Sequence, residues 1–91
     1  MLKEYHLIIK GCVQGVGFRF FVKTLADQYN LVGYTKNLPD RSVEICIQGN
    51  ESTVNDFLET LKKPPSRIKI TEILLTVTVF KETFKIFEIV Y

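Results

Sequence analysis

The alternation of apolar and polar side chains predicts strands along most of this sequence. From Tyr5 to Lys10 every second side chain is apolar, so that Tyr5, Leu7 and Ile9 share one face. The same period of two predicts further strands over residues 31–38, 43–48, 67–80 and 84–91. Within the fourth of these strands the alternation slips near Ile73-Leu74, which predicts a bulge or a bend.

Two other stretches repeat with the period of a helix. The first helix is predicted from about Phe20 to Tyr29-Asn30, because asparagine tolerates a left-handed cap. The second is predicted between Asn50, whose side chain suits an N-cap, and Pro64-Pro65, which cannot continue a helix. Their apolar stripes are Phe18, Val22, Leu25, Ala26 and Tyr29 in the first, and Val54, Phe57, Leu58 and Leu61 in the second. Both stripes indicate core packing rather than a cofactor site.

The order of these elements predicts an α+β, ferredoxin-like (split βαβ) sandwich. We expect an antiparallel sheet of four strands plus an edge strand, with two helices on one face. Residues 38–41 form the turn between the second and third strands, and residues 81–83 form a polar turn before the last. In this topology the first two strands are parallel, with the third between them. Their carboxyl ends therefore emerge at one edge, about 10 Å apart.

Length and composition limit what such a fold can do. The 91 residues predict one domain over 1–91, and 46% hydrophobic residues support one core rather than a closed cavity. A ligand site is therefore expected as an open cradle at the rim. The net charge of +2, with acidic and basic residues interspersed, predicts no nucleic-acid partner. Without a leader pattern or a membrane-length apolar run, the chain is expected to be cytoplasmic, with no membrane partner.

The cysteines and the single histidine predict no metal site and no covalent catalysis. Cys12 and Cys46 are too few for a disulfide scaffold and have no His or Cys neighbour at metal spacing. We interpret both as strand residues in a reduced protein. His6 lies on the less apolar face of the first strand, at the end away from the glycines, and is predicted to be a solvated strand residue.

The stretch from Gly11 to Arg19 is the strongest candidate for a site. It holds three glycines in seven residues between a strand and a helix, so its backbone can bend and expose N–H groups at a helix N-terminus. Arg19 adds a cationic fork. Asn37 ends the second strand at the same rim, so an anion and a water are expected there side by side. The alternative is a glycine-rich connector with a surface arginine.

Two segments carry a resemblance to a known family. Residues 11–19 resemble the signature G-x-V-Q-G-V-x-F-R of the acylphosphatases, and residues 33–44 resemble their second signature, G-x-V-x-N-x-x-D-G-x-V-E. The Pro-Pro pair and the Phe87-Glu88-Ile89 ending are also similar to the family. The resemblance implies the ferredoxin-like fold with the last strand at a sheet edge. It also implies hydrolysis of acyl phosphates to a carboxylate and inorganic phosphate.

The resemblance also assigns roles to residues of this sequence. Arg19 is expected to hold the phosphate oxygens, and Asn37 to orient the attacking water. The backbone N–H groups that face the phosphate are expected from Gln14, Gly15, Val16, Gly17 and Phe18. The expected ligands are a small-molecule acyl phosphate and inorganic phosphate, as product and competitor. We expect no cofactor and no metal, and a monomer.

The second signature departs from the family at two positions. Thr35 replaces valine, and its hydroxyl needs a hydrogen-bond partner inside the strand. Arg41 replaces the turn glycine, and costs roughly 1–2 kcal/mol if the turn needs a left-handed residue there. A turn of changed geometry would alter the placement of Asn37.

Three other interpretations remain open at this stage. Ferredoxin-like domains also bind RNA on the open sheet face, although residues 43–48 lack the basic, glycine and aromatic pattern of such binders. The sequence is also compatible with an acylphosphatase-like domain of a larger maturation factor, and with a regulatory role through phosphate or acyl phosphate levels.

Overall fold

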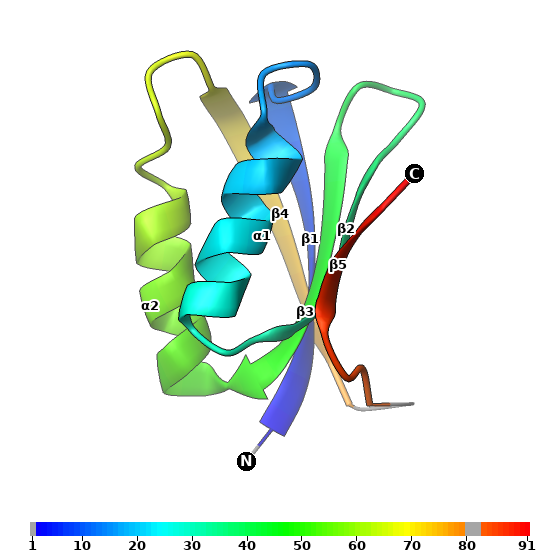
Figure 1. Ribbon diagram of the computed structural model, residues 1–91, viewed down its shortest axis with the longest axis vertical. Helices are drawn as coiled ribbons and strands as arrows, with labels where there is room; N and C mark the ends of the chain where they lie inside the picture. Colours follow the sequence, from blue (N-terminus) through cyan, green and yellow to red (C-terminus); the bar gives the residue numbers. More distant parts are fainter. Residues whose placement is uncertain (1, 80–82) are drawn as a thin grey trace.

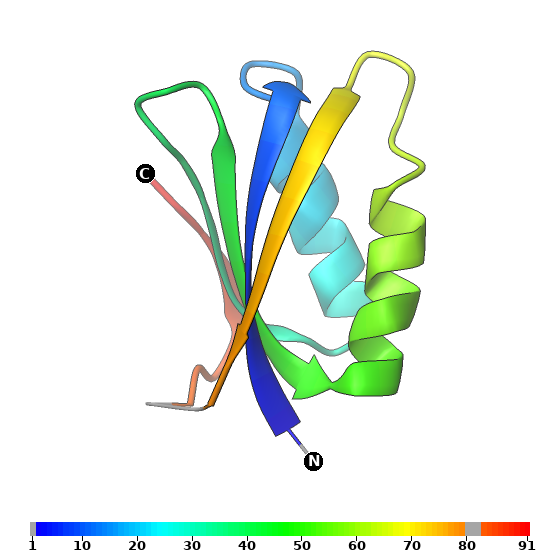
Figure 2. The same cartoon turned by 180° about the vertical axis from the view of Figure 1, so that it is seen from behind.

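Two helices lie side by side on one face of a five-stranded sheet, and none of the described residues forms a helix on the other face (Figures 1 and 2). The computed structural model describes residues 2–79 and 83–91. The elements are β1 (Leu2–Cys12), α1 (Phe18–Gln28), β2 (Val32–Asn37), β3 (Val43–Asn50), α2 (Glu51–Leu61), β4 (Lys69–Thr78) and β5 (Phe87–Val90). Neither helix in the described ranges is long and apolar enough to cross a membrane.

The strand order confirms the predicted ferredoxin-like sandwich. The sheet runs β4-β1-β3-β2-β5, and the pairs β1–β4, β1–β3 and β3–β2 are antiparallel. The strands β1 and β2 are therefore parallel, with β3 between them, as the split βαβ topology requires. The last strand lies at the sheet edge and pairs in parallel with β2, so the complete sheet is mixed.

The predicted apolar faces form a single core between the sheet and the helices. Tyr5, Leu7 and Ile9 of β1 are buried on the helical side. The buried helical residues are Phe18, Val22, Leu25 and Ala26 of α1 and Val54, Phe57 and Leu61 of α2. Tyr29 and Leu58, at the margins of the two stripes, are partly buried against the same cluster. The period of the sequence thus correctly predicted which faces pack together.

The helix ends differ from the prediction mainly at the start of α1. The helix begins at Phe18 rather than near Phe20, because Gly17 takes a left-handed conformation and serves as the N-cap. At the other end Asn30 is left-handed as predicted, with φ at 57°. Asn50 also precedes α2 as predicted, with extended backbone, although its side chain makes no capping hydrogen bond.

The irregularity in β4 lies closer to its start than predicted. The register of β1 against β4 shifts between Lys10 and Gly11, where Gly11 pairs with Ile70 and Lys10 with Glu72. Thr71 is therefore the extra residue, not Ile73 or Leu74. The slip in alternation misled the prediction because β4 is an edge strand with apolar side chains, such as Leu74 and Leu75, exposed on both faces.

Strands β2, β4 and β5 are shorter than the patterns suggested, whereas β1 and β3 are longer. The second strand begins at Val32 and ends at Asn37, and the last is limited to Phe87–Val90, the four residues that pair with β2. At the sheet edge alternation continues beyond the residues that have a hydrogen-bonding neighbour, whereas β1 and β3 pair with each other beyond the residues that alternate clearly. Residues 80–82, which include most of the predicted polar turn, lie outside the described residues.

Candidate active site

The glycine-rich loop between β1 and α1 leaves a row of backbone N–H groups without backbone partners among the described residues. Gly15 and Gly17 are left-handed, with φ at 75° and 78°. Left-handed residues that alternate with ordinary ones turn successive N–H groups toward one side, which creates an anion-binding concavity. Following the described residues from Gly15 onward, Phe21 is the first whose backbone N–H donates to a backbone carbonyl. Its acceptor is Gly17 O, at 3.0 Å.

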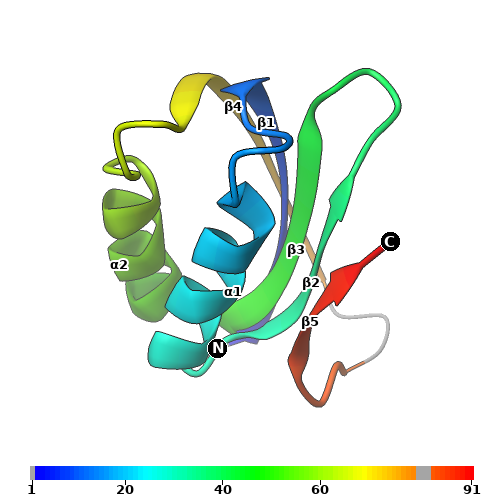
Figure 3. The same ribbon diagram turned by 45° about the horizontal axis from the view of Figure 1, so that its top comes forward.

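The loop, the start of α1, the end of β2 and the end of the chain border one hollow of about 240 Å³. Figure 3 shows these segments at one end of the molecule. The lining residues are Val13, Gly15, Gly17, Phe18, Arg19, Phe20, Asn37, Ile89 and Tyr91. The structure therefore brings Arg19 and Asn37 together, as the topology predicted. Of the other expected site residues, Gly15, Gly17 and Phe18 line this hollow, whereas Gln14 and Val16 do not.

Arg19 lies in the first turn of α1 and contacts the last two residues of the chain. Its Nη1 donates a hydrogen bond to the carbonyl oxygen of Val90 at 3.3 Å. Its Cζ lies 4.7 Å from the centre of the Tyr91 ring, which is a cation–π arrangement. A guanidinium has five N–H donors, so this single bond leaves most of the fork available to an anion.

Asn37 presents a buried polar atom to the same region. It is the last residue of β2 and pairs with Val43 of β3, which fixes its backbone. Its side-chain oxygen Oδ1 is buried and has no hydrogen-bond partner among the described residues. A buried acceptor without a donor is costly, so a residue kept in this state at the edge of a hollow suggests a bound O–H group.

The side chain of Gln14 joins the loop to the hairpin that carries Asn37. Its Nε2 donates to the carbonyl oxygens of Leu38 and Ser42, both at 2.9 Å. The two carbonyls lie on either side of the β2–β3 turn, so one amide group fixes the distance between the loop and that turn. Sequence reasoning gave Gln14 only a backbone role, and the cross-link was not predicted.

The turn itself confirms both expectations about the departures from the family signature. Arg41 is left-handed, with φ at 77°, as a residue that replaces a turn glycine must be when the turn is preserved. Thr35 is fully buried, and its hydroxyl donates to the carbonyl oxygen of Glu44 at 3.0 Å. Asp40 accepts from the backbone N–H and the hydroxyl of Ser42, and these bonds lower the pKa of the Asp40 carboxyl below its ordinary value.

Two further arginines lie beside the loop. The Nε of Arg67 donates to the carbonyl oxygen of Val16 at 2.9 Å, and its guanidinium also lies against Gly17. Arg41 lines a second hollow of about 330 Å³ together with residues 11–15. Together with Arg19 they make the surroundings of the loop cationic, which favours an anionic ligand.

Sequence reasoning missed Arg67 and Tyr91, and neither gave a usable signal. Arg67 follows the Pro-Pro segment after α2, and Tyr91 is a terminal residue beyond the periodic pattern. Only the docking of β5 against β2 brings Tyr91 to Arg19.

The remaining candidates lie away from this hollow or at its margin. Cys12 and Cys46 are unpaired strand residues, exposed and buried respectively. The prediction of a solvated His6 is only half right, because its side chain is 35% exposed but its Nε2 is 2.6 Å from Glu4 Oε2. The sequence spacing of histidine and cysteine gave no hint that β1 and β3 place His6 opposite Cys46.

The topology and the cationic loop define a ferredoxin-like domain with an anion-binding rim. Residues 5–89 match the Acylphosphatase family. The acylphosphatase of Bacillus subtilis is 41% identical over 88 residues, which are 97% of each chain, and that of Clostridium acetobutylicum is 37% identical over all 91 residues. A crystal structure of acylphosphatase from Bacillus subtilis superimposes with a TM-score of 0.93 at 42% identity, with both chains fully covered.

The chain belongs to the acylphosphatase family, as the two signatures suggested. Its activity is the hydrolysis of acyl phosphates, and it is a hydrolase acting on acid anhydrides. The same fold also matches 12% of a full-length HypF chain crystallised in a phosphate- and nucleotide-bound form, with a TM-score of 0.92 and 37% identity.

Proposed function

We propose that the hollow beside the β1–α1 loop is where this enzyme binds and hydrolyses its acyl phosphate. In this proposal Arg19 and backbone N–H groups of Gln14 to Phe18 bind the phosphate oxygens, and Asn37 orients the attacking water. The observation that carries it is the buried Oδ1 of Asn37, which has no partner in the described part of the chain and belongs to a residue that lines the same hollow as Arg19. Asn37 Oδ1 can accept a hydrogen bond from a water molecule, and the neighbouring Arg19 can bind the phosphate beside that water.

The reaction needs positioning and charge stabilisation more than acid–base catalysis. Asn37 Oδ1 accepts one O–H of the water, which directs the oxygen lone pair at phosphorus. As the new P–O bond forms, the bond from phosphorus to the acyl oxygen breaks, and the carboxylate leaves with the electron pair. The other proton of the water passes to a phosphate oxygen of the substrate. Charge spreads over the equatorial phosphate oxygens in a loose transition state, where the Arg19 fork and the amides stabilise it.

A larger hollow is a poorer candidate. It measures about 380 Å³ and lies at the other end of α1, where its lining includes Asn30, Gln48 and Asn50. No charged side chain is among its lining residues within the described ranges. Because a phosphate dianion needs a cation or several aligned donors, the smaller hollow is the better phosphate site.

The proposal is tested by hydrolysis of benzoyl phosphate with inorganic phosphate as the competing ligand. Arg19→Ala should lower the rate by about 10²–10³ and abolish inhibition by phosphate, because the charge and the fork are both lost. Arg19→Lys should recover little, since a lysine offers no bidentate geometry. Asn37→Ala should lose turnover but still be inhibited by phosphate.

The difference in phosphate inhibition between Arg19→Ala and Asn37→Ala decides which residue binds phosphate and which orients the water. Equal loss of phosphate inhibition in Arg19→Ala and Asn37→Ala would contradict a water-orienting role for Asn37. Lys62→Ala is the control, because it removes an exposed positive charge at the end of α2, away from the hollow. It should behave like the wild type.

We further propose that residues 1–91 act as one domain, in a monomer, in the cytoplasm, with no cofactor in the hydrolysis and with no nucleic acid or membrane partner. Two unpaired cysteines support a reducing compartment. Sedimentation velocity of the purified chain tests the oligomeric state, and filter binding to RNA at moderate salt tests the nucleic-acid alternative. Tight RNA binding without hydrolysis would favour that alternative.

A further inference from the structure

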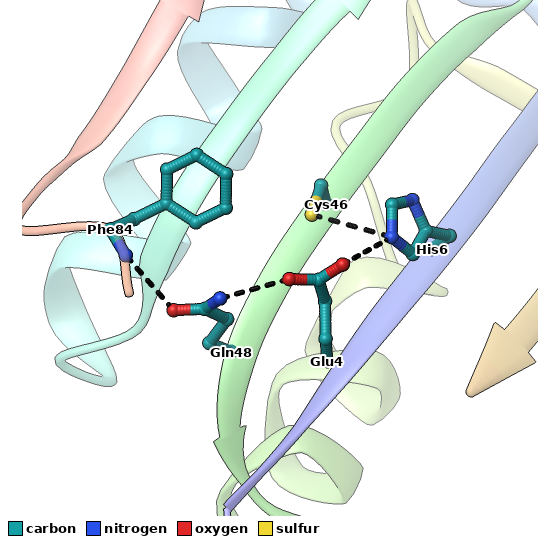
Figure 4. Close-up of polar contacts among 5 residues, drawn as sticks. All are labelled: Glu4, His6, Cys46, Gln48 and Phe84. Carbon is teal, nitrogen blue, oxygen red and sulfur yellow. Dashed lines mark hydrogen bonds and ion pairs between the residues drawn. The ribbon is translucent and has the colours of Figure 1, made fainter. Parts of the chain in front are cut away.

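The open face of the sheet carries three metal-ligating side chains that the proposed catalytic hollow does not use. Glu4 and His6 come from β1, and Cys46 comes from β3, where it pairs directly with His6. One carboxylate oxygen, one ring nitrogen and the sulfur lie within 4.8 Å of one another. Figure 4 shows the three side chains converging on the face away from the helices.

The geometry of this Glu4–His6–Cys46 cluster is close to that of a zinc site. His6 Nε2 lies 2.6 Å from Glu4 Oε2 and 3.8 Å from Cys46 Sγ. Ligand atoms on a tetrahedral Zn²⁺, with bonds of about 2.0–2.3 Å, lie roughly 3.3–3.6 Å apart. These two separations have to change by less than about one ångström, and the carboxylate oxygen and the sulfur, which lie within 4.8 Å of each other, have to approach by at most about 1.5 Å. Side-chain rotations supply such shifts.

Supporting hydrogen bonds already hold the carboxylate in place. Gln48 Nε2 donates to Glu4 Oε1 at 2.9 Å, and the backbone N–H of Phe84 donates to Gln48 Oε1 at 3.1 Å (Figure 4). This arrangement occupies one oxygen of Glu4 and leaves the other directed at His6. Metal-binding carboxylates are commonly oriented by such outer hydrogen bonds.

Negative charge favours a cation at this position, and the partly exposed His6 gives the ion access to it. Glu4 is 8% exposed and Cys46 1% exposed, whereas the His6 side chain is 35% exposed, so an ion can reach the cluster from the His6 side. The carboxylates of Glu4 and Glu44 lie near the Cys46 sulfur, and their negative charge attracts a divalent cation.

We propose that Glu4, His6 and Cys46 form a Zn²⁺ site on the open face of the sheet, separate from the catalytic hollow. A carboxylate, an imidazole and a thiolate are a ligand set that Zn²⁺ accepts, and three protein ligands leave a fourth position for water. When the ion binds, the thiol releases its proton to solvent and the sulfur becomes a ligand. Bound Zn²⁺ links β1 to β3 and, through Gln48, to the segment before β5.

Cobalt substitution tests this site directly, because Co²⁺ bound to a thiolate absorbs by sulfur-to-metal charge transfer. The full chain is titrated with Co²⁺ in a buffer that contains a phosphine reductant, which keeps the thiols reduced without competing for the ion. Zn²⁺ is then added to displace the bound Co²⁺. Wild type and Cys12→Ser, the control that removes the other thiol, should both show the band. It should disappear in Cys46→Ser.

Two further variants separate the ligands from their support. His6→Asn removes a ligand at a half-exposed position and should weaken Zn²⁺ binding by more than about 100-fold. Gln48→Met leaves the three ligands in place but removes the hydrogen bond to Glu4, and should weaken binding by about 10–100-fold. Circular dichroism of each variant shows that it is folded before its affinity is measured.

A thermal unfolding series supplies an independent measurement. The midpoint of wild type and of Cys12→Ser should rise with Zn²⁺ concentration, because the folded state alone holds the assembled site. The midpoint of Cys46→Ser should not rise. A cobalt–thiolate band that persists in Cys46→Ser, or a folded wild type with neither band nor Zn²⁺-dependent midpoint, overturns the proposal.

Discussion

Arg41 is a residue in a conformation that suits glycine better. Its φ of 77° lies in the left-handed region, where a side chain brings Cβ too close to the following carbonyl oxygen. The β2–β3 turn imposes this angle, since Leu38 N donates to Ser42 O at 2.9 Å and Arg41 N donates to Leu38 O at 3.1 Å. The sequence predicted the cost because the turn signature has glycine at this position.

Replacing Arg41 by glycine should therefore stabilise the protein. The left-handed strain is about 1–2 kcal/mol, and the greater freedom of glycine in the unfolded chain returns about 0.5–1 kcal/mol of it. We expect the free energy of unfolding to rise by roughly 0.5–1 kcal/mol in urea titrations. Arg41→Ala keeps the strain and removes the charge, so it serves as the control. An equal gain in both variants would assign the effect to charge.

Asp40 makes the stability of the protein depend on pH in the acidic range. Hydrogen bonds from the Ser42 hydroxyl and then its backbone N–H lower the pKa of Asp40 below the ordinary value of 3.8. A carboxyl with a lowered pKa in the folded state stabilises the protein above its unfolded pKa, and this contribution is lost as pH falls through the folded pKa.

We expect the stability difference between wild type and Asp40→Asn to shrink as the pH decreases below about 4. The asparagine keeps an oxygen acceptor for Ser42 but does not titrate, so it isolates the effect of the charge. Urea unfolding at a series of pH values measures the difference. A gap that stays constant from neutral pH to the acid limit would show that the charge of Asp40 contributes nothing.

At the scale of elements, the important feature is that one side chain joins the glycine-rich loop to the β2–β3 hairpin. Gln14 donates both hydrogens of its amide to carbonyl oxygens on the two sides of the β2–β3 turn. Arg19 is held separately, by α1 and by the last residues of the chain. The two proposed roles, phosphate binding and water orientation, thus depend on different supports.

Gln14→Leu should separate these two roles. The carbonyls of Leu38 and Ser42 lose their donor, which lowers the free energy of unfolding by about 1–3 kcal/mol and loosens the hairpin that carries Asn37. The kcat for benzoyl phosphate should fall, while inhibition by inorganic phosphate should persist. Gln28→Leu, at an exposed position at the end of α1, is the matched control. A parallel loss of phosphate inhibition would refute the separate supports.

The sequence predicted the elements well and their ends less well, for local reasons. Periodicity identifies the buried face of a helix or strand, and it placed Leu7, Val22 and Phe57 correctly in the core. It does not report where backbone hydrogen bonding begins. Because Gly17 is left-handed and caps the helix, α1 begins two residues before the predicted start. The pairing with β2 limits β5 to four residues. Neither effect is visible in the apolar pattern.

At the scale of the whole molecule, β5 and Tyr91 complete the lining of the hollow beside the β1–α1 loop. The docking of β5 at the edge of the sheet carries Tyr91 to the hollow, where its ring lies under the Arg19 guanidinium. Tyr91 is 93% exposed, so it contributes little to the core. Its contact with Arg19 orients a cation that the proposal assigns to phosphate.

Tyr91→Ala should weaken inhibition by inorganic phosphate without unfolding the protein. An exposed cation–π contact contributes about 0.5–1 kcal/mol, which corresponds to a roughly two- to fivefold change in affinity. Tyr91→Phe keeps the ring and should retain wild-type inhibition. The midpoint of thermal unfolding should be similar in all three proteins. If Tyr91→Phe were as impaired as Tyr91→Ala, the hydroxyl rather than the ring face would be responsible.

The sequence by itself determined the core, the topology and the loop that bears Arg19, because periodicity and glycine placement act locally along the chain. Signature spacing also predicted that Arg19 and Asn37 meet, since the split βαβ order brings two strand ends to one edge. Tertiary structure alone decided the contacts between distant segments. Tyr91 at Arg19, Gln14 at the hairpin, and Cys46 opposite His6 each depend on a strand register or a docking edge that no local pattern specifies.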